Sequence, residues 1–82
     1  MIATYRKRPL VVEAVHFVGK ESGDFIVGWA NAEWVENGRA LLIQTLEGDL
    51  RADHGDWVIR GAKGEFYPCK ADIFAMTYEN AP

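Results

Sequence analysis

The sequence has 82 residues, of which 49% are hydrophobic and 12% aromatic, and its net charge is −3. A chain of this length forms one domain, and its aromatic content is untypical of disorder, so we expect residues 1–82 to fold as a single unit. The negative charge disfavours general nucleic-acid binding, which needs a concentrated basic surface. The single cysteine, Cys69, excludes an internal disulfide and fits a reducing compartment.

The sequence carries no sign of export or of membrane insertion. Glu13 and His16 interrupt the apolar run that follows the basic residues 6–8, so we expect no signal peptide. No run approaches the ~18 apolar residues of a membrane span. We therefore expect a soluble cytoplasmic protein.

Residues 4–18 are predicted to be extended. Apolar side chains occupy both alternating positions between Leu10 and Phe17, which indicates a strand covered in part on both faces. Pro9 has no N–H donor and indicates a bend or a sheet edge. The basic residues 6–8 would keep such an exposed edge from pairing with another chain.

One helix is predicted at about residues 22–31. Ser22 is the candidate N-cap, and Asp24 in the first turn would suit the helix dipole. Gly28 weakens the helix, so its length is left open. One apolar face at helical spacing is expected to pack on a sheet, and it consists of Phe25, Ile26 and Trp29.

The rest of the chain is predicted as short strands separated by turns. Asn37-Gly38 is typical of a two-residue hairpin loop. The predicted strands are residues 34–35, 39–46, 50–54, 57–60 and 65–67, with further turns at 47–49, 55–56 and 61–64. Residues 71–74 are predicted as a helical turn, and residues 75–79 either close as a strand or continue that turn. The tail, residues 80–82, is expected to fray.

These elements predict an α+β fold. Short strands with glycine-rich corners favour a small curled antiparallel sheet or open barrel. It would carry one helix at about 22–31 and a short helical turn near 71–74. A parallel sheet is disfavoured because crossover helices are too few.

The sequence gives only weak support for three kinds of site, a catalytic thiol, a metal site and a phosphate-binding loop. Cys69, His54 and Asp56 have the residue types of an activated thiol, but no catalytic spacing supports them, so a structural cysteine is favoured. No ligand pair has zinc-site spacing, and His16 fits a strand better than a metal site. The glycine-flanked turn 61–64 matches neither a P-loop nor a dinucleotide fingerprint. We expect no enzyme, no metal and no cofactor.

Aromatic and basic residues are the better candidates for binding. Three core tryptophans (Trp29, Trp34 and Trp57) are favoured, although a third is often partly exposed and then marks a binding surface. An aromatic face beside arginine and lysine could also hold a base and a phosphate. The candidate binding residues are Trp57, Arg60, Lys63, Glu65, Tyr67 and Lys70.

Several motifs follow one another in a fixed order: residues 5–15 (YRKRPLVVEAV), 42–48 (LIQTLEG), 55–61 (GDWVIRG) and 64–70 (GEFYPCK), with Asp72-Ile-Phe74 and Tyr78. In this order they resemble one group of small proteins encoded by tailed bacteriophages and prophages, including those of actinobacteria. The likeness spans nearly the whole chain. The group often has a Pro-Gly-Asp-Tyr/Trp corner, whereas here His54 replaces the proline and Trp57 holds the aromatic place. The resemblance implies origin and fold, and it brings no established catalytic role.

This resemblance implies a non-enzymatic phage accessory protein in the host bacterial cytoplasm. It would bind a host or phage protein, in host takeover or counter-defence, through a sheet edge or a Trp-centred patch. The alternative is a binder of a small anionic ligand or nucleotide signal, which would use Arg60, Lys63 and Lys70. A hydrolase or transferase using Cys69 or paired carboxylates is the weakest hypothesis. A homo-oligomer is also expected, because small domains often bury exposed strand edges against a second copy.

Overall fold

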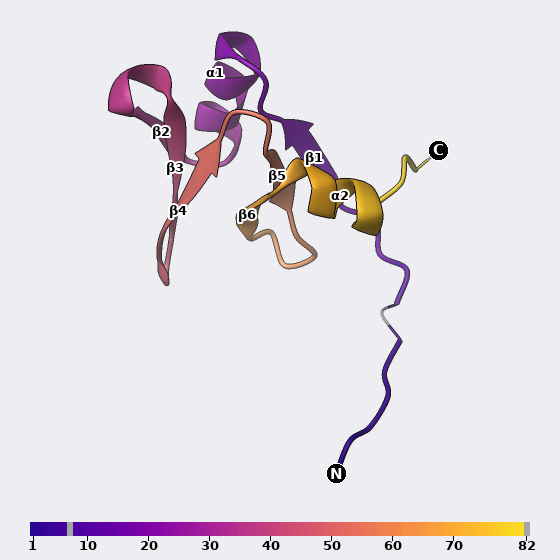
Figure 1. The fold of residues 1–82 in the computed structure, drawn as a ribbon. Helices are drawn as coiled ribbons and strands as arrows, with labels where there is room; N and C mark the ends of the chain where they lie inside the picture. Colours follow the sequence, from indigo (N-terminus) through magenta and orange to yellow (C-terminus); the bar gives the residue numbers. More distant parts are fainter. Residues whose placement is uncertain (7, 82) are drawn as a thin grey trace.

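The computed structural model describes residues 1–6 and 8–81. Within them the chain forms two helices, one short 3-10 helix and six strands, and the strands make two separate three-stranded antiparallel sheets (Figure 1). The prediction of an α+β fold with antiparallel strands is confirmed. The prediction of one curled sheet or open barrel is wrong, because β2, β3 and β4 pair only among themselves and neither sheet is closed or curled.

The first sheet, sheet A, combines segments from both ends of the chain. Its order is β1-β5-β6, where β1 is Glu13–His16, β5 is Trp57–Arg60 and β6 is Phe66–Cys69. The predicted strand at 57–60 is therefore confirmed. The prediction of a strand over residues 4–18 holds only for β1. Pro68 lies in β6, an edge strand, where a missing N–H donor is tolerated.

The second sheet, sheet B, is a meander of β2 (Ala32–Val35), β3 (Ala40–Thr45) and β4 (Gly48–Asp53). Val35 pairs with Ala40, so four residues connect β2 and β3. The predicted two-residue loop is wrong because the left-handed backbone begins one residue early. The three residues of the 3-10 helix η1 have positive φ of 54°, 56° and 84°, and they are Glu36, Asn37 and Gly38.

Helix α1 (Lys20–Trp29) begins two residues before the predicted start. Ser22 is not its cap, because Gly19 holds the N-cap position. The Ser22 hydroxyl instead accepts the Val18 N–H at 2.9 Å, and it donates to the Gly19 carbonyl at 3.3 Å. The serine thus fixes the entry to the helix from inside its first turn.

The contact between α1 and sheet B depends on a glycine. A Cβ atom added at Gly23 would lie 2.2 Å from the Trp34 ring, so only glycine allows this close approach. Ile26 is fully buried and Trp29 packs beside it, as predicted for this face of the helix. Phe25 departs from that prediction, since it is 57% exposed at the rim.

The hydrophobic core lies between α1 and the two sheets. Its side chains come from α1, sheet B and one face of sheet A, and the largest are Phe17, Ile26, Leu41, Ile43 and Val58. Two of the three tryptophans, Trp29 and Trp34, are half-buried against this core. Trp57 lies on the opposite face of sheet A, which the alternation along β5 places away from Val58.

Helix α2 (Ala71–Thr77) covers that opposite face. The predicted helical turn at 71–74 is confirmed but is longer, and the alternative of a last strand at 75–79 is wrong. Asn80 and Ala81 form no regular structure, and Pro82 of the predicted frayed tail lies outside the described residues. Neither α1 nor α2 has the length and apolarity needed to cross a membrane.

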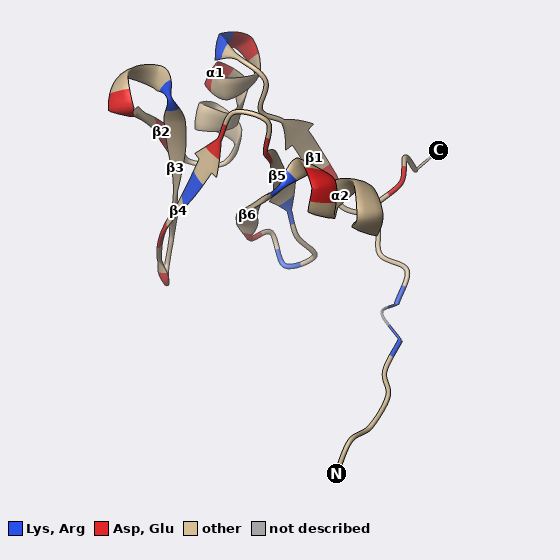
Figure 2. Cartoon of the chain, viewed as in Figure 1, with Lys and Arg blue, Asp and Glu red and all other residues tan. Residues whose placement is uncertain are grey.

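An N-terminal segment, of which residues 1–6 and 8–12 are described, is extended and runs away from the body of the molecule (Figure 1). We refer to it as the arm. Its described residues belong to no helix or strand, and its exposed large apolar side chains are Met1, Ile2, Tyr5, Leu10 and Val11. Arg6 and Arg8 are its described charges (Figure 2), and Lys7 lies outside the described residues.

The arm gives the chain an unusually large surface. The accessible surface is 6482 Å², whereas a compact 9.2 kDa protein exposes about 4,900 Å². The radius of gyration is 13.9 Å, against about 12 Å for a compact chain of this length. The chain therefore exposes about 1,500 Å² beyond what a self-contained domain of its mass would expose.

Candidate functional site

The turn from Asp53 to Asp56 joins the two sheets and is held by one buried carboxylate. Asp56 is only 5% exposed, and its Oδ2 accepts the Asp53 N–H at 2.9 Å. Its carbonyl oxygen accepts the Phe17 N–H at 2.9 Å, and the Gly55 N–H donates to the Phe17 carbonyl at 2.7 Å. A side chain that closes its own turn in this way has a structural role.

Lys70 connects that turn to the start of α2. Its Nζ lies 3.4 Å from carboxylate oxygens of both Asp53 and Asp56. The hydrogen bond to Asp53 and the charge of Asp56 raise the pKa of Lys70. Arg51 also donates to Asp53 at 2.8 Å, and this bond, together with Lys70, lowers the pKa of that carboxyl. Lys70 is therefore neutralised by its own chain, and an anionic ligand would have to displace two carboxylates.

Trp57 is the centre of an aromatic stack. The His16 ring is parallel to it with ring centroids 4.4 Å apart, and the Phe74 ring is stacked on it at 4.1 Å and 5°. Phe74 in turn contacts Tyr78, with ring centroids 5.0 Å apart. Because rings of its own chain stack on Trp57, this tryptophan offers no open platform for a nucleobase.

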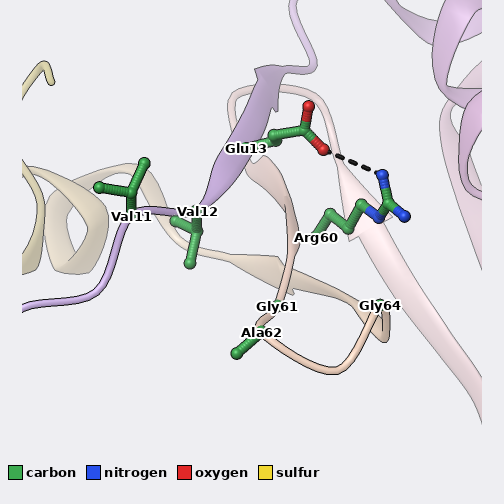
Figure 3. A pocket seen from close by; sticks show the side chains of 7 residues that line it. All are labelled: Val11, Val12, Glu13, Arg60, Gly61, Ala62 and Gly64. Carbon is green, nitrogen blue, oxygen red and sulfur yellow. Dashed lines mark hydrogen bonds and ion pairs between the residues drawn. The ribbon is translucent and has the colours of Figure 1, made fainter. Parts of the chain in front are cut away.

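Arg60 lies on the other face of sheet A from Trp57. Its guanidinium donates to Glu13 at 3.1 Å (Figure 3). This pair borders a shallow pocket of about 210 Å³, lined by Val11, Val12, Glu13, Arg60, Gly61, Ala62 and Gly64. Two candidate residues, Arg60 and Trp57, are thus held on opposite sides of one sheet.

Lys63 and Glu65 belong to a turn that satisfies its own polar groups. The Glu65 carboxylate accepts the Lys63 N–H at 2.9 Å, and the Gly61 N–H donates to the Glu65 carbonyl at 2.7 Å. A Cβ atom at Gly61 would lie 2.3 Å from that carboxylate, which is the far end of an exposed and flexible side chain. The Lys63 side chain is exposed. This is the hairpin turn that the sequence predicted.

Tyr67 contacts the end of the chain. The pKa of the Tyr67 hydroxyl is raised to about 12, mainly by a hydrogen bond to Tyr78 and secondly by burial. Three of the candidate residues hold α2 in place, and they are Trp57, Tyr67 and Lys70. Trp57 stacks on Phe74 within α2, Tyr67 bonds just beyond its last residue, and Lys70 is its N-cap residue. Half of the six candidate residues converge on the placement of α2.

The residues of the weak thiol hypothesis are engaged elsewhere. The His54 Nε2 lies 2.9 Å from the Gly38 carbonyl, and its ring stacks on Phe17 at 4.2 Å. Cys69 is half-buried in β6, and its Sγ lies 3.6 Å from the Lys70 carbonyl. Across residues 1–6 and 8–81, no three His, Cys, Asp or Glu side chains gather as a metal site.

The larger pocket was not predicted from the sequence. It has a volume of about 360 Å³ and is lined by Lys20, Trp34, Gly38 and His54. The Trp34 indole N–H donates to Asp24 at 2.9 Å, and the Lys20 ammonium pairs with the same carboxylate. The i, i+4 spacing of Lys20 and Asp24 could have predicted their ion pair from the sequence. Nothing local in the sequence placed Trp34 and His54 beside it.

No family model, curated protein or solved structure matches this chain. What the chain does must therefore be inferred from its own residues and their geometry.

Proposed function

We propose that this chain is a non-enzymatic accessory protein of a tailed bacteriophage or prophage that acts by binding a host or phage protein. The observation that carries the proposal is the apolar surface that α2 exposes at Ile73 and Met76. The motif resemblance described above supports the phage origin.

Helix α2 is the surface that we assign to the partner protein. Ile73 is 49% exposed and Met76 is 81% exposed. Residues three apart are neighbours on a helix surface, so these two side chains form one apolar anchor that points away from sheet A. Short helices presented in this way insert into hydrophobic grooves of partner proteins.

The contacts that hold α2 against sheet A suit the binding of a partner protein. A helix of seven residues is too short to be stable by itself in water. The stack with Trp57 and the Tyr67–Tyr78 hydrogen bond hold it in place before any partner arrives. Ordering the helix in advance removes part of the entropy cost of binding.

Affinity capture with matched variants tests this proposal. Tagged chain is incubated with lysate of infected bacteria, and captured proteins are identified and then titrated by calorimetry. We expect the double change Ile73→Glu with Met76→Glu to raise the Kd at least about tenfold, because apolar anchors carry most of the binding energy. The matched control is Leu46→Glu, at a fully exposed turn between β3 and β4. Capture that survives the double change and fails with Leu46→Glu would contradict the assignment of α2.

The alternative function, binding of a small anionic ligand or nucleotide, has a different location. The pocket beside Trp34 and His54 is within the size range of small-molecule sites and carries Lys20 at its rim. We expect a nucleotide bound there to quench Trp34 fluorescence and to raise the melting temperature. A panel of nucleotides that gives no thermal shift rules this alternative out.

A further inference from the structure

The outer edge of β1 is unpaired in the described chain. β1 is a terminal strand of sheet A and pairs only with β5. The Phe17 N–H and carbonyl both face the β4–β5 turn, through Asp56 and Gly55. Successive residues of an antiparallel strand alternate in the side to which both backbone groups point. The backbone groups of Val12, Ala14 and His16 therefore face outward.

This edge has two of the devices that normally protect an exposed strand, a short length of four residues and one exposed charge, Glu13, and it lacks the others. Proteins block such edges with lysine, proline, bulges or inward charges. The eight residues from Leu10 to Phe17 contain no lysine, proline or glycine, and their single charge, Glu13, is paired with Arg60. The basic residues 6–8 and Pro9 were predicted to protect this edge, but they lie upstream of it.

Apolar surface continues from the edge into the arm. Leu10 is 57% exposed and Val11 is 79% exposed. Both are large side chains beside an open ladder, and Val11 also lines the pocket next to Arg60 (Figure 3). A strand added to the edge would cover them, and the excess surface of about 1,500 Å² is larger than the ~800 Å² that each partner buries in a standard interface.

The charge distribution identifies the added strand. The arm holds three of the nine basic residues of the chain and none of its twelve acidic residues. Residues 13–82 therefore hold six basic and twelve acidic residues, a net charge of −6, while the arm carries +3. An arm of this charge is attracted to the body of a second copy and is repelled by another arm, so it favours a partner's body as its resting place.

We propose that the segment from Leu10 to His16 pairs antiparallel with the same segment of a second copy, in a register that places the two Glu13 side chains opposite each other, each neutralised by the Arg60 of its own chain. Antiparallel pairing of identical strands is two-fold symmetric, so the contact closes as a dimer and does not grow into a fibre. The two copies of sheet A become one six-stranded sheet of order β6-β5-β1-β1-β5-β6. Each arm then runs past the β1 of its partner toward the start of α1, where Lys20 and Glu21 lie. This interface is separate from α2 and does not rest on the proposed function.

Sedimentation velocity on the full chain tests the dimer. Between about 1 µM and about 500 µM, a range in which micromolar Kd values are resolved, we expect conversion from 9.2 kDa to twice that mass. Val12→Pro removes an outward N–H donor from each copy and leaves the β1–β5 ladder intact. We expect it to raise the dimer Kd at least about tenfold, because the two-fold axis doubles every loss. Thr4→Pro, in the arm but outside the paired segment, is the matched control.

Amide hydrogen exchange locates the interface. We expect the amides of Val12 and Ala14 to be protected at high concentration and to exchange rapidly on dilution, whereas Val15, which faces β5, stays protected at both. A chain that is monomeric at about 500 µM overturns the proposal. A dimer in which Val12 and Ala14 remain unprotected, or in which Val12→Pro has no more effect than Thr4→Pro, also overturns it. Circular dichroism of each variant shows that the fold is retained.

Discussion

The two sheets of this protein have similar sizes but are stabilised by different interactions. Sheet B and α1 bury aliphatic side chains, and Leu41, Ile43 and Ile26 are fully inaccessible. The outer face of sheet A buries a single aliphatic side chain of β5, Ile59, and is otherwise covered by a seven-residue helix through an aromatic stack and a few polar contacts. The two surfaces that we assign to protein partners, α2 and the outer edge of β1, both belong to the sheet A half, whereas the pocket beside Trp34 and His54 lies in the sheet B half. Local stability varies within one domain in this way, and binding elements come from the weaker end.

Truncation of the sheet B core should have the largest effect. We expect Leu41→Ala to lower the free energy of unfolding by about 2–5 kcal/mol, since it removes buried methyl groups and leaves a cavity. The control is Ile73→Ala on α2, which is half exposed and should change stability by less than about 0.5 kcal/mol. Urea unfolding followed by circular dichroism measures both. Equal losses would show that the two halves do not differ in the way described.

Loss of Asp56 should have the next largest effect, because this residue links the two halves. We expect Asp56→Ala to cost about 1–3 kcal/mol, since it leaves the Asp53 N–H without its acceptor and Lys70 without one carboxylate. Asp56→Asn keeps an oxygen acceptor and should lose less. If the alanine and asparagine variants unfold at the same urea concentration, the hydrogen bond to Asp53 is not what the carboxylate supplies.

Loss of the stack should loosen α2 and leave sheet B unchanged. We expect Phe74→Ala to cost about 1–2 kcal/mol, from a stack of about 0.5–1.5 kcal/mol together with the burial of a half-covered ring. The amides of α2 should lose protection from hydrogen exchange, while those of β3 keep it. Met76→Ala, on the exposed side of the same helix, is the control. Uniform loss of protection across β3 and α2 would mean that the two halves unfold as one unit.

The parts of the fold that were predictable depend on local signals. β5 was predicted with its observed bounds because Gly55-Asp56 and Gly61–Gly64 delimit it on both sides. The turns at 47–49 and 55–56 were placed within a residue or two for the same reason. The division into two sheets was not predictable, since pairing partners are chosen by contacts between distant segments, which no local pattern encodes. The strand predicted for the arm was wrong for the same reason. Its apolar alternation is typical of a strand, but no other strand of the described chain pairs with it.

The candidate site shows the same limit. Trp57, Tyr67 and Lys70 were named from a motif, and the structure gives them a shared position around α2. Arg60, Lys63 and Glu65 come from the same motif but engage Glu13 and the hairpin turn. Adjacent positions in a strand point to opposite faces, so one motif serves two sides of a sheet. The stack of His16 and Phe74 on Trp57 was hidden from the sequence, because the three rings come from separate segments.

The smallest expected effect is the response of the Tyr67 clamp to alkaline pH. The pKa of Tyr67 is about 12 in the folded chain against 10.0 ordinarily, so the folded state keeps a proton that the unfolded state has lost. The contribution of this group to stability is complete below pH 10 and is lost as the pH rises through about 12. We therefore expect Tyr67→Phe to be less stable than the native chain near pH 8, by about 0.5–1.5 kcal/mol for one hydrogen bond.

The difference between these two chains should shrink as the pH approaches 12, because phenylalanine has no proton to lose. The pKa of Lys70 is also raised, so both chains lose its contribution to stability as the pH rises. This loss is the same in both chains and cancels in the difference. Urea unfolding at several pH values between about 8 and 12 measures this difference. Tyr5→Phe, at an exposed position of the arm, should give a difference near zero throughout. A Tyr67→Phe difference that stays constant to pH 12 would show that the hydroxyl does not clamp the end of α2, and that the aromatic stack alone separates this half of the molecule from the other.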